Sequence, residues 1–183
     1  VGCVGAKLLY PDNTIQHAGI GFGFLTLAAH MHKNFPVGHP GYMGRLVYAQ
    51  DVYAVTAACL MVRKSVYEQV NGLDESFAVA FNDVDFCVRV REAGYTNVFT
   101  PFAQLYHYES KSRGGDEKDP VKAARFAAEQ QRLYTIHGKE NILDDPYYNP
   151  NLTRDREDFS ESDDLRRLKE GRVTVRFRGG TLQ

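Results

Sequence analysis

The sequence predicts an α/β fold, and two observations lead to this prediction. Short apolar segments rich in β-branched residues alternate with segments of helical periodicity, as in α/β domains. The 183 residues are enough for one domain with its own core. The pattern opens on "VGCVGAKLLY", in the middle of a strand and without an initiator Met or a signal peptide. It also holds fewer strands than an α/β sheet normally needs, so we expect an N-terminal part to be missing.

The composition excludes several classes of protein. With 43% hydrophobic residues, 25% charged residues and a net charge of -1, it gives no electrostatic reason to expect nucleic acid or a membrane surface as partner. The longest apolar runs are far too short to span a membrane. The three cysteines, Cys3, Cys59 and Cys87, match neither a disulfide framework nor a zinc pattern. A reducing cytoplasm is therefore the expected compartment.

The first half of the chain reads as strands followed by a loop. Residues 3–10 are typical of a short buried strand, and 11–14, "PDNT", of the turn that ends it. The glycine-rich apolar stretch 15–24 predicts a second strand or extended segment. Residues 26–44 hold three His and two Pro without periodicity, which predicts a surface loop. For His30, His32 and His39 in that loop, a solvated position is favoured over a metal cluster, and His17 is interpreted as structural.

The middle of the chain predicts one strand and two helices. Residues 51–62 begin β-branched and apolar, and 64–70 read as a short helix stopped by Asn71 and Gly72. The stretch "FNDVDFCVRVREAGY" predicts the next helix, with Asn82 as N-cap and Gly94 as the stop. Its mostly buried face recurs at helical spacing, at Val84, Cys87, Val88 and Arg91.

The last third predicts a strand, a long helix and a polar tail. Residues 96–109 read as a strand that breaks at Pro101 and resumes, followed by a polar loop at 110–119. The segment "DPVKAARFAAEQQRLYTIHG" predicts the clearest helix, with Asp119 as N-cap, Pro120 in the first turn and Gly138 at its end. Beyond it the chain is polar and irregular, with one expected helix near 163–169 and a short strand at 173–178.

Four segments in this order resemble the C-terminal half of inverting family 2 glycosyltransferases with a GT-A type fold, of the bacterial polysaccharide and O-antigen kind. They are "VGAKLLYPDNTIQHAGIGFG", "AACLMVRKSVYEQVNGLDESF", "FNDVDFCVRVREAGYTNVFTPFAQLYHYESKSRGG" and "DPYYNPNLT". The resemblance implies a mixed sheet with flanking helices from which the N-terminal, nucleotide-binding half is missing. It assigns 1–138 to the catalytic-base and acceptor half, and 139–183 to a polar C-terminal extension.

The resemblance also implies roles for individual residues. In the family, the second member of an acidic pair that opens a helix is the catalytic base, and Asp83 holds this position; Asn82 stands where the first acid is usual. A His after the next strand is a metal ligand in the family, here His107. The loop that follows covers the donor, and Arg113 is the candidate phosphate contact there. The small residues that line the acceptor side correspond to Ala57, Ala58 and Cys59, together with Asp85.

The implied reaction transfers a sugar from a nucleotide-sugar donor to a glycan or lipid-linked acceptor with inversion. A carboxylate takes the proton of the attacking hydroxyl, and a divalent cation, Mn²⁺ or Mg²⁺, stabilises the diphosphate leaving group. An imidazole ligand such as His107 suits Mn²⁺ better than Mg²⁺. The isolated chain is expected to be inactive, and the whole protein to work in the cytoplasm, with peripheral association at the inner face of the membrane left open.

Simpler interpretations remain beside these. First-turn carboxylates are often only caps or dipole partners, and Asp85, three residues after Asn82, fits a capping box, so a structural role is favoured for it. The chain could instead be a non-catalytic acceptor-binding or assembly module that lacks the donor site. A metal-dependent hydrolase built on Asp83, Asp85 and His107 is a third possibility, although no nucleophile signature accompanies it.

Overall fold

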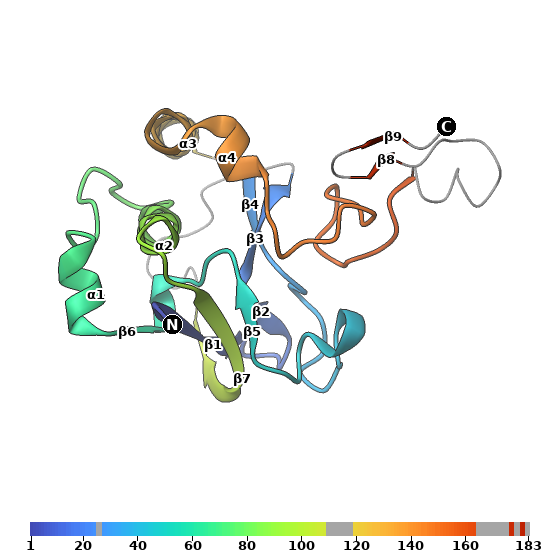
Figure 1. Cartoon of the computed structure of the whole chain (residues 1–183). Helices are drawn as coiled ribbons and strands as arrows, with labels where there is room; N and C mark the ends of the chain where they lie inside the picture. The colour runs from blue at the N-terminus through green and yellow to red at the C-terminus, as the bar shows by residue number, and fades with distance from the viewer. Residues whose placement is uncertain (25–26, 109–118, 164–175, 178–179, 182–183) are drawn as a thin grey trace.

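The computed structural model describes residues 1–24, 27–108, 119–163, 176–177 and 180–181. It is a mixed α/β structure in which strands form a curled sheet and helices flank one side (Figure 1). The main sheet has five strands. They are β1 (Cys3–Leu9), β2 (Ile15–His17), β5 (Gln50–Val52), β6 (Leu60–Val62) and β7 (Asn97–Tyr106).

Strand β1 is the centre of this sheet. It pairs in parallel with β7 from Val4 to Leu9, and antiparallel with both β6 and β2. The predicted break at Pro101 takes the form of a bulge, because Ala6 pairs with Thr100 and the next residue, Lys7, pairs with Gln104. β7 therefore continues past its proline as one strand, with β5 antiparallel on its other edge.

The predicted surface loop at 26–44 is wrong in its first part. Strand β4 (Leu27–His30) pairs with β3 (Ile20–Phe24) as a separate antiparallel hairpin. His32 is only 1% exposed, its ring stacks on Phe159 with centroids 4.4 Å apart, and its Nε2 accepts the N–H of Tyr42. Of the three histidines predicted to be solvated, only His39 is exposed. His32 is buried by packing against Phe159, which lies far along the chain, so the local composition could not predict its burial.

Helices α1 (Lys64–Gln69), α2 (Asn82–Glu92) and α3 (Pro120–His137) lie where the sequence predicts them. The side chain of Asp119 accepts the N–H of Val121, and Gly138 ends α3 at φ 78°, as expected of an N-cap and a C-terminal glycine. A further short helix, α4 (Lys139–Leu143), follows directly and was not predicted. In Figure 1, α2 lies between the sheet and α3.

The cap predicted for α2 is wrong. Phe81, not Asn82, occupies the N-cap position, in the left-handed conformation at φ 63°. Asn82 is the first helical residue, and its side chain accepts the N–H of Asp83 at 2.7 Å. The Phe81 ring is buried and packs on Phe126 of α3, 4.9 Å between centroids. Tertiary packing of the ring thus accompanies a backbone conformation that a non-glycine residue seldom adopts.

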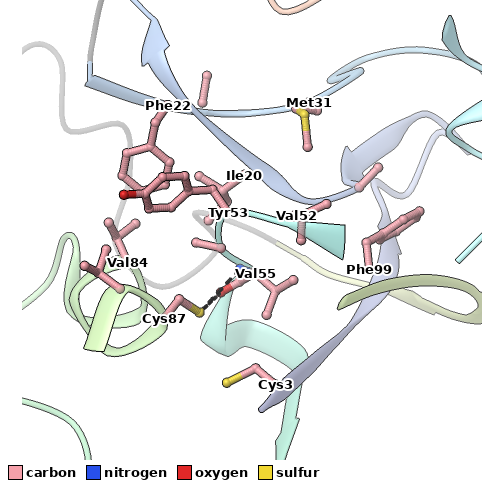
Figure 2. Packing of buried hydrophobic residues seen from close by; sticks show 14 of the residues in the cluster. Cys3, Ile20, Phe22, Met31, Val52, Tyr53, Val55, Val84, Cys87 and Phe99 are labelled. Carbon is pink, nitrogen blue, oxygen red and sulfur yellow. Dashed lines mark hydrogen bonds between the residues drawn. The ribbon is translucent and has the colours of Figure 1, made fainter. Parts of the chain in front are cut away.

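The hydrophobic core fills the space between the sheet, the β3–β4 hairpin and α2 (Figure 2). Phe22 and Phe99 are fully buried, and Cys87 of α2 lies against Val55, whose carbonyl oxygen is 3.5 Å from the sulfur. Asn97 is also buried, and its amide donates to the carbonyl oxygens of Tyr53 and Cys87. These contacts fix the position of α2 on the sheet.

The described part of the C-terminal extension packs on the same core. Ile142, Tyr148, Leu152 and Phe159 are buried members of the hydrophobic cluster. The carboxylate of Asp145 accepts the N–H of Phe22 at 3.0 Å. The division at residue 138 remains a prediction, as does the tail helix, which lies almost wholly outside the described residues.

The strand expected at 173–178 is described only at β8 (Arg176–Phe177), which pairs with β9 (Gly180–Thr181). Among the residues that the structure describes, no helix combines the length and apolar character that crossing a membrane requires.

Candidate active site

The candidate site begins at the first turn of α2. Asp83 is half-buried there, and its Oδ1 accepts the N–H of Val84 at 2.8 Å. Its Oδ2 accepts the N–H of Ala57 at 3.1 Å, across 26 residues of sequence. Helix N-termini favour negative charge, so the position suits an ionised carboxylate. Each oxygen keeps a lone pair that these bonds do not use.

The partner of Asp83 belongs to the predicted acceptor-side segment. Ala57, Ala58 and Cys59 form a single 3₁₀ turn, η2 (Ala57–Cys59), which is capped by the Thr56 hydroxyl accepting the N–H of Ala58. Ala57 and Ala58 are exposed beside the carboxylate. The structure therefore brings the predicted base together with Ala57, Ala58 and Cys59, but the fourth predicted acceptor-side residue, Asp85, is buried against His137 and Arg89 instead. The roles of Asp83 and of the η2 turn remain predictions.

A buried histidine lies behind this turn. His17 is 0% exposed, and its Nε2 lies 3.4 Å from the N–H of Thr56 and 3.3 Å from that of Gly19. Its Nδ1 lies 2.8 Å from Nδ1 of His30. Burial, with the nearby His30 and His107, holds the pKa of His17 well below its usual range, so the ring is neutral. The structural interpretation of His17 agrees with this geometry.

His107 directly follows β7, and it lies close enough to His17 to contribute to the lowered pKa of that histidine. Its N–H donates to the carbonyl oxygen of Leu9 at 2.8 Å. Its Nδ1 is buried and has no hydrogen-bond partner among the described residues. An orphaned imidazole nitrogen fits a metal ligand. No group of three or more His, Cys, Asp or Glu in the described part of the chain could complete a metal site, however. Arg113, the predicted phosphate contact, lies outside the described residues.

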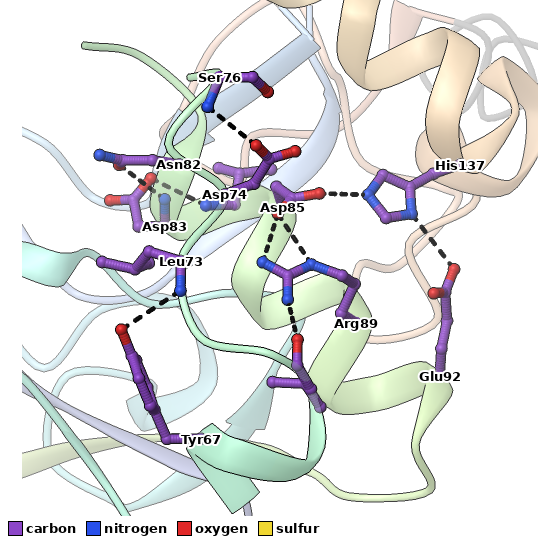
Figure 3. A network of polar contacts seen from close by, with 12 residues as sticks. Tyr67, Leu73, Asp74, Ser76, Asn82, Asp83, Asp85, Arg89, Glu92 and His137 are labelled. Atoms are coloured by element: carbon purple, nitrogen blue, oxygen red, sulfur yellow. Dashed lines mark hydrogen bonds and ion pairs between the residues drawn. The ribbon is translucent and has the colours of Figure 1, made fainter. Parts of the chain in front are cut away.

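Asp85 occupies a different environment from Asp83 (Figure 3). It is 1% exposed; its Oδ1 accepts from Nε2 of His137 at 2.8 Å, and its Oδ2 accepts from Nε and Nη2 of Arg89 at 2.9 and 2.6 Å. His137 also contacts Glu92 through Nδ1 at 3.3 Å. Asp85 does not form the predicted capping-box hydrogen bond with Asn82. Its role is structural in a different way, because it joins α2 to the end of α3.

The titration of this pair follows from its contacts. Burial favours the neutral form of both groups, but the hydrogen bonds between them, with Arg89 and Glu92, outweigh it. The pKa of Asp85 is lowered and that of His137 is raised. His137 and Arg89 were missed by the sequence reasoning. Asp85, their shared partner, lies on another helix than His137 and one turn before Arg89 on the same helix. A histidine at a helix end carries no local signal for such a pair.

Comparison with known proteins gives several relatives of the chain. No protein-family model matches the chain. An uncharacterized protein of Sinorhizobium fredii, y4gI, is 51% identical over 160 residues, which cover 87% of this chain and 17% of that protein. The O-antigen biosynthesis protein RfbC of Myxococcus xanthus is 35% identical over 154 residues, 84% of this chain and 12% of that protein.

A third relative has a more specific name. The N-acetylglucosaminyl-diphospho-decaprenol L-rhamnosyltransferase of Mycobacterium tuberculosis is 35% identical over 80 residues, 44% of this chain and 24% of that protein. The chain thus spans less than a quarter of the length of these relatives. The names of the second and third relatives support a glycosyltransferase family at a coarse level.

Proposed function

We propose that the chain is the catalytic-base and acceptor half of an inverting glycosyltransferase with a GT-A type fold. The observation that carries the proposal is the contact between Asp83 Oδ2 and the N–H of Ala57, which puts a carboxylate at a helix N-terminus beside an exposed small-residue turn. The names of two relatives, an O-antigen biosynthesis protein and a rhamnosyltransferase, support a nucleotide-sugar donor and a glycan or lipid-linked acceptor.

In this proposal Asp83 takes the proton from the attacking hydroxyl of the acceptor. General-base catalysis of this kind contributes about 10²–10⁴-fold to the rate. The Ala57 and Val84 amides fix the direction of the carboxylate, and the free lone pairs face the acceptor. The small side chains of η2 leave room for a sugar hydroxyl within reach of Asp83. Inversion follows if the acceptor attacks from the face opposite the leaving group.

A divalent cation, Mn²⁺ or Mg²⁺, would stabilise the diphosphate leaving group when bound. The orphaned, buried Nδ1 of His107 supports a role for this residue as one of its ligands. The remaining ligands would come from the donor diphosphate and from polypeptide outside the described residues. Arg113 stays the proposed phosphate contact, and the cytoplasm the proposed compartment, in line with the free cysteines Cys3, Cys59 and Cys87.

The first test is the variant Asp83→Asn in the intact protein that contains this chain. Because Asn cannot accept the hydroxyl proton, we expect turnover to fall at least 10²-fold while donor affinity changes less than twofold. Transfer is measured as release of UDP or dTDP from UDP- and dTDP-sugars. Asp12→Asn is the matched control, since Asp12 is an exposed carboxylate that bonds to Thr14 in a turn. Near-normal turnover in Asp83→Asn would remove Asp83 as the base.

The second test is His107→Ala in the same protein. Loss of an outer-shell partner lowers metal affinity about 10–100-fold, so loss of a direct ligand should lower the Mn²⁺ affinity of the protein at least about tenfold. Calorimetric titration of Mn²⁺ in the presence of UDP measures it, and an unchanged titration would exclude His107 as a ligand.

A non-catalytic acceptor-binding module is the second candidate. It is favoured by one observation, that the chain covers only 12% of RfbC and 24% of the rhamnosyltransferase, which leaves the donor site to another part of the protein. Under both readings the isolated 183-residue chain should bind UDP- and dTDP-sugars weakly or not at all. Micromolar binding by the isolated chain, measured calorimetrically, would show that the donor site is not missing.

A further inference from the structure

A buried glutamate on α3 holds the loop that leads into the candidate base. Glu129 is 5% exposed, and its Oε1 accepts the N–H groups of Ala78 and Val79 at 3.1 and 3.3 Å. Its Oε2 accepts the N–H of Ala80 at 2.7 Å. Three successive amides converge on one carboxylate, which is the arrangement of a backbone anion-binding nest. Here the anion is supplied by the protein itself.

The nest lies immediately before the first turn of α2. Ala80 is followed by Phe81 at φ 63°, and the helix begins at the next residue, so Asp83 is three residues beyond the last bonded amide. The Phe81 ring packs on Phe126, one turn before Glu129 on the same face of α3. Helix α3 therefore contacts both the backbone of residues 78–80 and the ring of Phe81, directly before the turn that carries Asp83.

We infer that Glu129 is a positioning residue for Asp83. This inference rests on the proposed function, because it assigns Glu129 an effect on the base. Hydrogen bonds from amides to a carboxylate are shorter and stronger than those between neutral groups, and three of them leave the loop one conformation. That conformation directs the start of α2 so that Asp83 Oδ2 meets the N–H of Ala57.

The test uses Glu129→Gln in the intact protein. Gln keeps the shape but offers only one acceptor oxygen, and its NH₂ group faces amide donors. The amides of 78–81 should exchange with deuterium at least tenfold faster, as measured by mass spectrometry. A displacement of the base of about 1 Å costs on the order of 10²-fold in rate, so we expect kcat to fall 10–100-fold, with KM for UDP- and dTDP-sugars within twofold.

Arg132→Gln is the matched control. Arg132 lies on the same helix and also reaches this loop, but its Nη2 is 3.5 Å from Asp74 Oδ2 and both side chains are partly exposed. Its loss should leave kcat within twofold. A merely structural role of Glu129 would lower the amount of folded protein and leave kcat per folded molecule unchanged.

A double-mutant cycle separates the possible outcomes. In the Asp83→Asn background, Glu129→Gln should lower turnover less than twofold further, because its effect passes through Asp83. An equal loss in both backgrounds, or an unchanged kcat in Glu129→Gln, would overturn the inference while leaving the proposed function intact. Full activity in Asp83→Asn would remove the proposed base and this inference with it.

Discussion

Replacing Asp85 with Asn tests the buried network that joins α2 to α3. Asp85 accepts hydrogen bonds at 2.6–2.9 Å from Arg89 and His137, and its side chain and that of His137 are 1% and 2% exposed. Hydrogen bonds to charged groups contribute about 1.5–3 kcal/mol each, and removing one member of a buried ion pair costs about 3–5 kcal/mol. Asn keeps one acceptor oxygen, so we expect a loss of about 3 kcal/mol in the free energy of unfolding.

Equilibrium unfolding of the 183-residue chain in urea measures this loss, and Glu68→Gln is the control. Glu68 pairs with Lys64 at the same i,i+4 spacing as Asp85 with Arg89, but at 3.6 Å and with side chains 63% and 87% exposed. Exposed pairs of this kind contribute about 0.3–0.5 kcal/mol. A loss in Asp85→Asn no larger than that of the control would refute the argument that burial makes this network important.

The pKa shifts of Asp85 and His137 also predict how the loss of stability in Asp85→Asn depends on pH. The raised pKa of His137 means that its contribution is complete below the unfolded value of 6.5 and is lost as pH rises through the folded pKa. The lowered pKa of Asp85 means that its contribution is present above 3.8 and is lost as pH falls through the folded pKa. The deficit of Asp85→Asn should therefore be larger near pH 5 than near pH 9. A larger deficit at pH 9 would contradict the assigned charges.

Two further substitutions test other parts of the fold. Gly5→Ala should lower the free energy of unfolding by about 1–3 kcal/mol, because the added Cβ would lie 2.5 Å from Val55 Cβ. In the control Gly38→Ala the added Cβ meets nothing within 4 Å, so the change should stay within about 0.5 kcal/mol. Thermal unfolding of both variants measures the difference. Burial lowers the pKa of His32 to about 3, so the stability it contributes is present above 6.5 and is lost as pH falls towards 3. Between pH 7.5 and pH 5, the free energy of unfolding in urea should fall by about 2 kcal/mol more in the wild type than in His32→Phe. An equal fall in both proteins would contradict this prediction.

The elements with local signals could be predicted, and those set by distant partners could not. The helix α3 has its cap, its first-turn proline and its terminal glycine within one segment, and all three act as expected. The cap of α2 was misassigned because the conformation of Phe81 is accompanied by packing on a helix that begins 39 residues later in the chain. Strand β4 was missed because its hydrogen-bond partners, not its composition, define it.

The candidate site divides in the same way. The family resemblance selected Asp83, Ala57 and His107, and the structure brings the first two into contact. Glu129 carries a signal that local reading could have used, since a carboxylate in the face shared by Phe126 and Leu133 is costly to bury without partners. That signal predicts a buried acceptor, but the identity of its three amide donors requires the tertiary structure.

The two carboxylates of "FNDVDFCVRVREAGY", Asp83 and Asp85, point in different directions because of helix geometry. Successive residues of an α-helix are turned by about 100°, so Asp83 and Asp85 point about 200° apart. One carboxylate therefore reaches the turn at Ala57, and the other reaches His137 on α3. Since Asp85 is held in a buried ion pair, it cannot replace the acid that the family resemblance leads us to expect at the position of Asn82. The proposed proton transfer at this end of α2 therefore depends on Asp83 alone among the carboxylates of its first turn, and on the orientation that Glu129 gives it.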